Sequence, residues 1–464
     1  MFSYMKQEKG FYRHFFSLAF PLIIQNLLSW TLSFADSLIV GSLGETAIAA
    51  VTLYNIPARI VWMFSFGAQN GTAILVSQYW GKKDMKSINK VLGIGLYGVM
   101  IVSAVFCLIM FTIPEQFISL FGNDPEIISM AVEYGQISSV ATLINNFNLI
   151  YLSVLRSVEE PRFGTVLLGF SMVFNIVFDY AFINGFWFIP KMGIAGAAWA
   201  TLAVKIIEIT AIIFNILFNK KFRVIPGCVL RPGFEILKGY LINAGLVITD
   251  ETLWGSGTSA FSNVMSHMQD STALLSASSV SGNIDYALTC FELGISSAAA
   301  VVIGKMVGEG QDKEKIKKAG YALITVSTLT GVLTGLLLLL AEGSIGVSWL
   351  YPLFGLSGLS AQYCSMMVRT VCWIIPLKNY NNTMVTGVLR GGGDTTVSTM
   401  IDLLPLWAVA VPYCYIVGFL LNGSAFWVYF ANAVQYLIQT LVGAIRIRSD
   451  SWIKDITVHP AEEE

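Results

Sequence analysis

The chain has 464 residues, of which 55% are hydrophobic and only 12% are charged. An average soluble domain carries roughly 25% charged residues, so this composition excludes a soluble globular protein. The formal net charge of −1 indicates neither an acidic nor a basic partner, and we expect no nucleic-acid partner.

The apolar residues form runs long enough to cross the hydrocarbon core of a bilayer, which takes about 20 residues of helix. Helices are predicted rather than strands, because backbone groups in lipid must form their hydrogen bonds within the segment. The first run is too long for a signal-peptide core, so we expect it to remain in the mature protein. The predicted fold class is an all-α integral membrane protein with twelve transmembrane helices, over residues 15–41, 47–79, 91–113, 126–155, 163–183, 193–217, 239–264, 273–304, 319–341, 360–389, 397–421 and 424–445.

Basic residues predict the orientation of these spans. If the N-terminus is cytoplasmic, the inside loops hold nearly all lysines and arginines that lie outside the spans, whereas the outside loops hold Lys191 alone. Cytoplasmic loops are rich in Lys and Arg under the positive-inside rule. We therefore expect both termini on the cytoplasmic side of a prokaryotic cell membrane.

The second half of the sequence repeats the first. The segment "GAQNGTAILVSQYWGKK" that begins at Gly67 matches "GISSAAAVVIGKMVGEG" that begins at Gly294, and both lead into a lysine-rich loop. Each copy has an even number of spans, so the two six-helix halves share one orientation, as in parallel-repeat transporters with a binding site between the repeats. We expect an N-lobe over 1–218, a cytoplasmic linker over 219–238 and a C-lobe over 239–464.

Five short segments stand out along the chain, namely Ala19 to Pro21, Asp36 to Gly44, Val76 to Gly81, Gly193 to Thr201 and Leu389 to Thr395. In order and at family-like spacing, they resemble sequence signatures of the multidrug and toxic compound extrusion (MATE) transporters. The resemblance implies two helical bundles that face a central cavity. It also implies antiport, in which entry of Na⁺ or H⁺ drives export of organic, often cationic, compounds by alternating access. We expect no cofactor besides that ion, and a monomer in membrane lipid.

Four polar residues of the N-lobe are the leading candidates for coupling. An ionisable residue at mid-helix costs at least ~2.5–3.5 kcal/mol on insertion scales, so it indicates function. Asn175 and Asp179 share one helix face at spacing i, i+4, and Asp36 and Thr201 are expected at similar depth. Their oxygens suit Na⁺, and two close carboxyl groups can also hold a proton. The set resembles the N-lobe coupling site of the MATE family; the alternative is a purely structural polar network. Pro21 is expected to be a hinge or helix-start residue, because a proline inside a helix removes a backbone hydrogen bond.

The C-lobe departs from the family pattern. Glu251 resembles the seventh-span glutamate of the branch that couples through this lobe, but Lys378 and Asn379 replace the acidic residue of the tenth span. At ~1.5 Å rise per residue, Glu251 and Lys378 lie at similar depth, which allows an ion pair. A lysine there would compete with a metal cation, so we expect no C-lobe sodium site. The pair could be structural or could bind substrate.

Other charges within the spans suggest structural roles. Lys205 and Glu208, at spacing i, i+3, are expected to neutralise each other. Asp402 is expected to make a structural or gating contact. Arg59 and Arg369 either line a cavity or form pairs with partners that the sequence does not identify.

Two other functions were weighed against cation-driven export. A flippase for lipid-linked saccharides would need a basic cavity, which Arg59, Arg369 and Lys378 could supply, but Asp36 and Asp179 argue against it. An intramembrane enzyme is disfavoured, because the sequence contains no His-Glu-x-x-His, Gly-x-Ser-x-Gly or Walker A motif.

Overall fold

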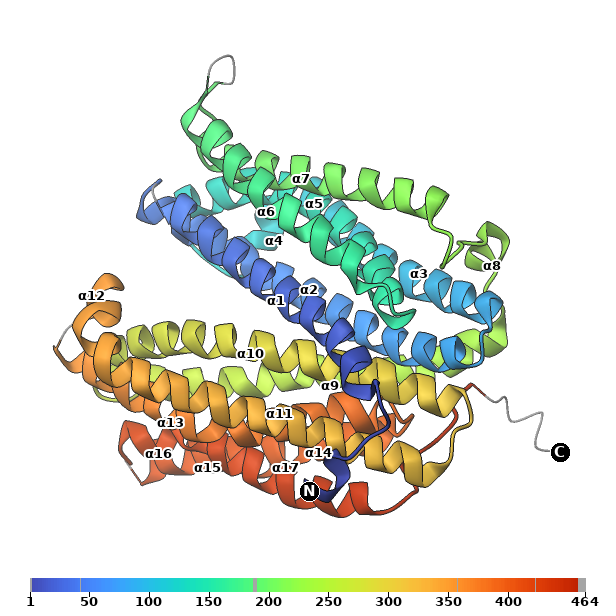
Figure 1. Cartoon of the computed structure of the whole chain (residues 1–464). Coiled ribbons are helices and arrows are strands. Elements are labelled where there is room, and N and C mark those ends of the chain that lie inside the picture. The colour runs from blue at the N-terminus through green and yellow to red at the C-terminus, as the bar shows by residue number, and fades with distance from the viewer. Residues whose placement is uncertain (1, 42, 187–189, 357, 422, 458–464) are drawn as a thin grey trace. The chain divides into compact units, whose positions relative to one another are not determined.

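The computed structural model describes residues 2–41, 43–186, 190–356, 358–421 and 423–457 (Figure 1). Ser42, within one of the family-like segments, and residues 458–464 of the expected tail lie outside the described residues. The described chain is almost entirely helical. Its elements are η1 (Phe2–Met5), α1 (Phe11–Gly41), α2 (Glu45–Gly81), α3 (Met85–Thr112), α4 (Pro114–Ile118), α5 (Pro125–Ser157), α6 (Pro161–Asn184), α7 (Gly193–Phe218), α8 (Pro226–Leu230), α9 (Phe234–Ser266), α10 (Ser271–Gly308), α11 (Lys313–Ala341), η2 (Glu342–Leu350), α12 (Tyr351–Leu353), α13 (Gly358–Asn382), η3 (Thr383–Leu389), α14 (Thr395–Leu404), η4 (Pro405–Ala410), α15 (Val411–Tyr415), η5 (Ile416–Leu420), α16 (Ala425–Tyr429) and α17 (Ala431–Arg448).

Within the described residues, 10 helical stretches are long and apolar enough to cross a membrane. The long helices α9 and α13 are not among them. Both occupy predicted spans but carry charged residues, namely Asp250 and Glu251 in α9 and Arg369 and Lys378 in α13. A long helix lies at each predicted span, and the all-α membrane fold is confirmed. Pro21 lies well inside α1, so its reading as a helix-start residue is wrong.

The chain divides into two compact units that share two helices. Among the described residues, unit 1 comprises 2–23 and 250–457, and unit 2 comprises 24–249. The first part of α1 therefore belongs to unit 1 with α10 to α17. Likewise, the first part of α9 belongs to unit 2 with α2 to α7.

Glycines allow the shared helices to pack closely. A Cβ atom at Gly294 of α10 would lie 2.7 Å from the backbone nitrogen of Ile23 in α1. A Cβ atom at Gly67 of α2 would lie 2.5 Å from the Cα atom of Ile248 in α9. Real Cβ atoms do not approach backbone this closely, so only glycine fits. Gly67 and Gly294 begin the matching segments of the internal repeat. The equivalent glycine of each repeat therefore packs against one of the two shared helices.

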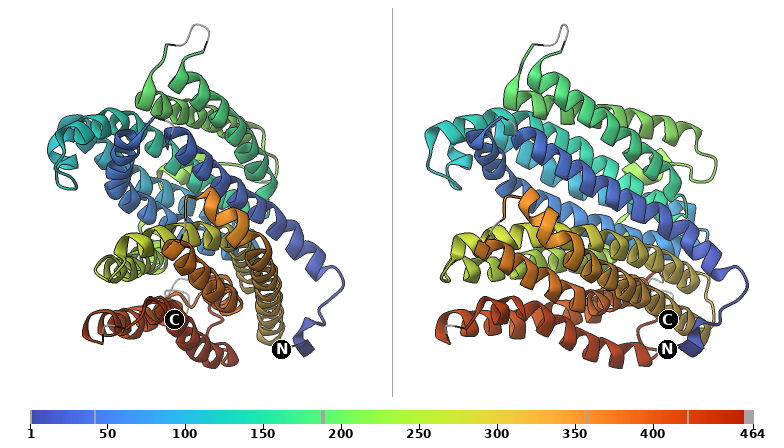
Figure 2. Two further views of the ribbon diagram at one scale, coloured as in Figure 1. Left: turned by 90° about the vertical axis from the view of Figure 1, so that its left-hand side faces the viewer. Right: turned by 60° about the vertical axis from the view of Figure 1, so that its left-hand side comes forward.

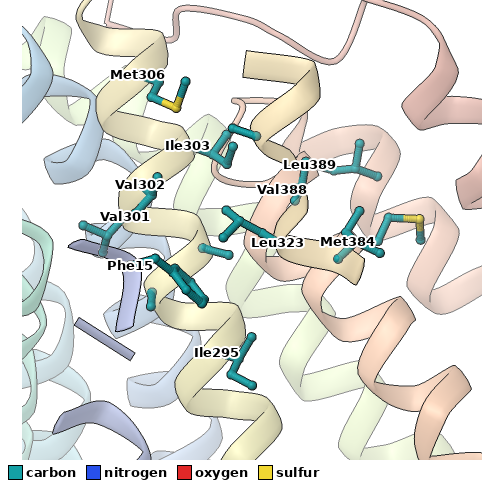
Figure 3. Close-up of a cluster of buried hydrophobic side chains, with 14 of the residues drawn as sticks. Phe15, Ile295, Val301, Val302, Ile303, Met306, Leu323, Met384, Val388 and Leu389 are labelled. Carbon is teal, nitrogen blue, oxygen red and sulfur yellow. The ribbon is translucent and has the colours of Figure 1, made fainter. Parts of the chain in front are cut away.

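A large apolar cluster holds the first part of α1 in unit 1. Figure 3 shows Phe15 of α1 among side chains of α10, α11 and η3. Phe15, Ile295, Leu323 and Met384 are all buried. A fully buried apolar side chain of this size stabilises the fold by ~1.5–3 kcal/mol, so the first part of α1 is firmly anchored in unit 1.

Unit 2 has its own apolar cluster between α2, α3, α4 and α5, the blue to teal helices of Figure 2. Tyr54 of α2 stacks edge-on against Tyr134 of α5, with ring centroids 5.4 Å apart. Helix α3 begins with a side-chain cap: Asp84 accepts hydrogen bonds from the backbone nitrogens of Lys86 and Ser87. Such a cap satisfies backbone donors that the first turn leaves unpaired.

Candidate functional site

In unit 2, α1 and α6 bring three of the four predicted coupling residues together. Asn175 and Asp179, one turn apart on α6, are both buried, and Asp36 of α1 is half-buried. The carboxyl groups of Asp36 and Asp179 both lie against the side-chain amide of Asn175. Two carboxylates held this close repel each other, which favours a proton on one of them.

The amide of Asn175 connects the two carboxyl groups. With its nitrogen turned toward them, Asn175 donates to Asp36 Oδ1 at 2.6 Å and to Asp179 Oδ2 at 2.7 Å. The opposite orientation would place the amide oxygen against carboxyl oxygens. It becomes favourable only when a cation lies between them, because an amide oxygen is an acceptor. The amide can therefore serve both an empty and a cation-filled site by turning over.

The fourth predicted residue, Thr201 of α7, contributes differently. Within the described part of the chain, no hydrogen bond joins its hydroxyl to Asp36 or Asp179. Lys205, one turn further along α7, interacts electrostatically with Asp36. The predicted Lys205–Glu208 pair is confirmed, with Nζ to Oε1 at 2.9 Å. Glu208 thus holds the ammonium group of Lys205 in place on α7, and sequence analysis missed the electrostatic interaction of Lys205 with Asp36.

In unit 1, Glu251 and Lys378 do not form the predicted pair. Lys378 donates instead to both carboxylate oxygens of Asp285, at 3.0 and 2.9 Å, and to the Thr289 hydroxyl at 2.6 Å. Glu251 lies 3.1 Å from Arg390 Nη1. Equal depth along two helices does not fix the direction in which their side chains point, which explains the error.

A small cavity lies beside the Lys378–Asp285 pair. Its lining includes Tyr429, Asn432 and Tyr436 of the last two helices. Asn379, the neighbour of Lys378, does not line it. The Asn379 amide is buried and donates to the backbone oxygen of Ser327 at 3.1 Å, a contact that ties α13 to α11.

The remaining predicted charges have separate environments. Arg369 pairs with Glu342 at 3.0 Å, which supplies the partner that the sequence left open. Arg59 is exposed. Asp402 accepts from the Gln439 amide at 2.8 Å and lies 3.5 Å from Arg390 Nη2, in agreement with a structural or gating contact.

Sequence analysis missed four charged residues of unit 1, although a usable signal was present for each. Asp250, Asp285 and Glu292 lie inside apolar spans, where an acidic residue is a functional candidate by default. Arg390 was noticed only as part of the family-like segment Leu389 to Thr395. Among the described residues, no group of three or more His, Cys, Asp or Glu side chains is arranged to hold a metal ion.

Buried polar clusters inside a bundle of long apolar helices define a multi-pass membrane transporter. The sequence model of the MatE family matches residues 21–181 and 253–416, one segment in each half, and the chain belongs to this family. Its members are transporters, so the intramembrane enzyme is excluded.

Relatives of the chain agree with this assignment. It is 22% identical to the uncharacterized transporter YisQ of Bacillus subtilis, with 95% of this chain and 94% of YisQ covered. It is 24% identical to a probable multidrug resistance protein NorM of Bradyrhizobium diazoefficiens, covering 87% and 85%. A MOP superfamily transporter from Pyrococcus furiosus, described as having a binding pocket of reverse polarity, has the same fold, with a TM-score of 0.83, 20% identity and coverage of 96% and 99%.

Proposed function

We propose that this chain is a secondary antiporter that exports organic, mainly cationic, compounds and uses Asp36, Asn175 and Asp179 as its coupling site. The observation that carries the proposal is the convergence of the carboxyl groups of Asp36 and Asp179 on the Asn175 amide. Two such groups share a proton because side-by-side carboxylates repel each other. The pair therefore changes its charge when it exchanges a proton, and this is the event that coupling needs.

We propose H⁺ as the coupling ion. Lys205 already supplies a positive charge near Asp36, and a cation beside a site weakens its attraction for Na⁺. Na⁺ is the second candidate, because Asn175 could turn its amide oxygen toward the two carboxylates. Thr201 would then complete the oxygen ligands by a change of its rotamer.

Coupling by this site would act on α1. When a proton enters, the two carboxyl groups can stay in contact; when it leaves, repulsion between the carboxylates separates α1 from α6. Since the first part of α1 belongs to the other compact unit, a displacement of α1 would affect both units. We further propose that both termini are cytoplasmic, in agreement with the distribution of basic residues.

The substrate proposal rests on the family and on names of relatives such as the probable multidrug resistance protein NorM. The pairing of Lys378 with Asp285 supports it in one respect, because an exposed lysine would repel an organic cation and the aspartate neutralises this one. The coupling ion and the substrate can be tested in one assay.

The test is efflux of the fluorescent cation ethidium from membrane vesicles, driven either by a proton gradient or by a sodium gradient. We expect Asp36→Asn and Asp179→Asn each to abolish proton-driven efflux. Glu342→Gln is the matched control, because Glu342 is a buried carboxylate with its own arginine partner, and we expect efflux close to the parent. Full proton-driven efflux by both aspartate variants would refute the coupling site, and efflux driven only by sodium would replace H⁺ with Na⁺.

A further inference from the structure

A second cluster of carboxyl groups, in unit 1, surrounds the guanidinium of Arg390. Arg390 follows the π-helical segment η3 and is buried. Its Nη2 contacts Asp250 and lies 3.5 Å from Asp402 Oδ2, and its Nη1 lies 3.1 Å from Glu251 Oε1. One cation therefore faces three acidic side chains from α9 and α14. If Asp250 and Asp402 were both ionised, their two negative charges would share the single positive charge of Arg390 at one nitrogen.

Burial makes such an excess of charge expensive. The side chains of Arg390 and Asp250 are each only 1% exposed. Removing an unpaired charge from water costs several kcal/mol, and a buried group with no compensating partner takes up a proton instead. The other ion pairs of this unit show the contrast: Glu342 has Arg369 and the Ser365 hydroxyl as partners, so its negative charge is matched.

Two independent features indicate where the proton lies. Oδ2 of Asp250 and Oδ2 of Asp402 meet at the same nitrogen of Arg390, Nη2, so the two carboxyl groups are held together and repel each other when both are ionised. In addition, the second carboxyl oxygen of Asp250, Oδ1, is buried and has no hydrogen-bond partner among the described residues. A bare carboxylate oxygen is costly at such a position, whereas the carbonyl oxygen of a protonated carboxyl group carries much less charge.

We propose that Asp250 and Asp402, held by Arg390, form a proton-binding site in unit 1 that is separate from the Asp36–Asp179 site. The bound proton lies between the two carboxyl groups and joins α9 to α14. When the proton leaves, the two groups become facing carboxylates, and their repulsion weakens that connection. The residue affected, Asp250, is the first residue of α9 that belongs to unit 1.

The surroundings of the site allow it to respond to protons and not to metal ions. Glu251 of α9 and Glu292 of α10 add negative charge, while Gln439 and Tyr436 of α17 are neutral neighbours of Asp402. Arg390 occupies the centre of the cluster, where a metal ion would otherwise bind. The proton is thus the cation that this site can exchange without losing its arginine.

The test is infrared spectroscopy of the full chain in lipid nanodiscs, with ¹³C label in the carboxyl group of aspartate. The label shifts the carbonyl band of a protonated aspartate away from that of any protonated glutamate. Measurements use the Asp36→Asn/Asp179→Asn double variant, so that the site in unit 2 contributes no labelled band. We expect a labelled band at neutral pH in this background, and its loss when Asp402→Asn is added.

Glu342→Gln in the same background is the matched control and should leave the band unchanged. If Asp402→Asn yields no folded protein, Asp250→Asn replaces it, because either change removes one carboxyl group of the pair. The absence of a labelled band in the double variant, or its survival in both unit 1 variants, would overturn the proposal. Neither result depends on efflux, so failure here is distinct from failure of the coupling site in unit 2.

Discussion

The contact between α1 and α10 at Gly294 can be tested with two substitutions in one helix. Gly294→Ala places a methyl group 2.7 Å from the Ile23 nitrogen and 2.9 Å from the Ile23 Cα atom. Both contacts are with backbone, so the helix itself must move. Gly282→Ala, also in α10, is the matched control, because a methyl group there meets nothing within 4 Å.

The expected difference follows from two opposing effects. Each substitution gains up to ~1 kcal/mol, because alanine favours helix over glycine. Only Gly294→Ala also suffers overpacking, which costs ~1–3 kcal/mol in a close-packed interior. The helix-propensity gain cancels in the comparison, so Gly294→Ala should be less stable than Gly282→Ala by ~1–3 kcal/mol.

The assay is unfolding of the purified protein in detergent, followed by circular dichroism during titration with a denaturing detergent. Equal stability of the two variants would refute the close approach of α1 to α10. A Gly294→Ala variant that is more stable than Gly282→Ala would refute it more strongly, since it would show free space at Gly294.

Two further predictions concern single charges. Burial raises the pKa of Asp84, but hydrogen bonds from Ser87 and the backbone of Lys86 outweigh burial and hold this pKa below its usual value. Asp84→Ala should lower the free energy of unfolding by ~0.5–2 kcal/mol at neutral pH. This loss should shrink as the pH falls through the pKa of Asp84, because the protonated parent also loses the contribution of the cap. Unfolding curves at several pH values check this, and a loss that does not change with pH would contradict it. Arg390→Met should cost ~3–5 kcal/mol by leaving buried acids unpaired, whereas Lys315→Met, from an exposed pair with Glu8, should cost less than ~1 kcal/mol. Similar losses for these two variants in the same unfolding assay would contradict the difference in burial.

The helices could be predicted from the sequence because lipid imposes a simple rule. A backbone in hydrocarbon must be helical, so a long apolar run defines an element and its approximate ends. The pairing of Asn175 with Asp179 was predictable for a similar reason, since spacing i, i+4 fixes a shared face within one helix. Both inferences concern residues that are close in sequence.

Contacts between helices were less predictable. Depth along a span follows from the rise per residue, but the direction of a side chain depends on the rotation and neighbours of its helix. Glu251 and Lys378 match in depth and yet contact Arg390 and Asp285. The division of α1 and α9 between the two units could not be predicted either. A hydropathy pattern shows that a helix is apolar, but it does not show which helices each end of it packs against.

Fixed cations distinguish the polar clusters of unit 1 from the carboxyl pair of unit 2. In unit 1, Lys378 contacts Asp285 and Arg390 contacts Asp250, so a lysine or arginine already occupies the place that a bound metal ion would take in each cluster. A diffusible metal cation would have to displace a covalently attached one, at the cost of leaving that side chain buried and unpaired. In unit 2, Asp36 and Asp179 face each other, and the nearby Lys205 is held by Glu208. A change of bound cation should therefore alter the charge of unit 2 most directly, while unit 1 responds through protons alone.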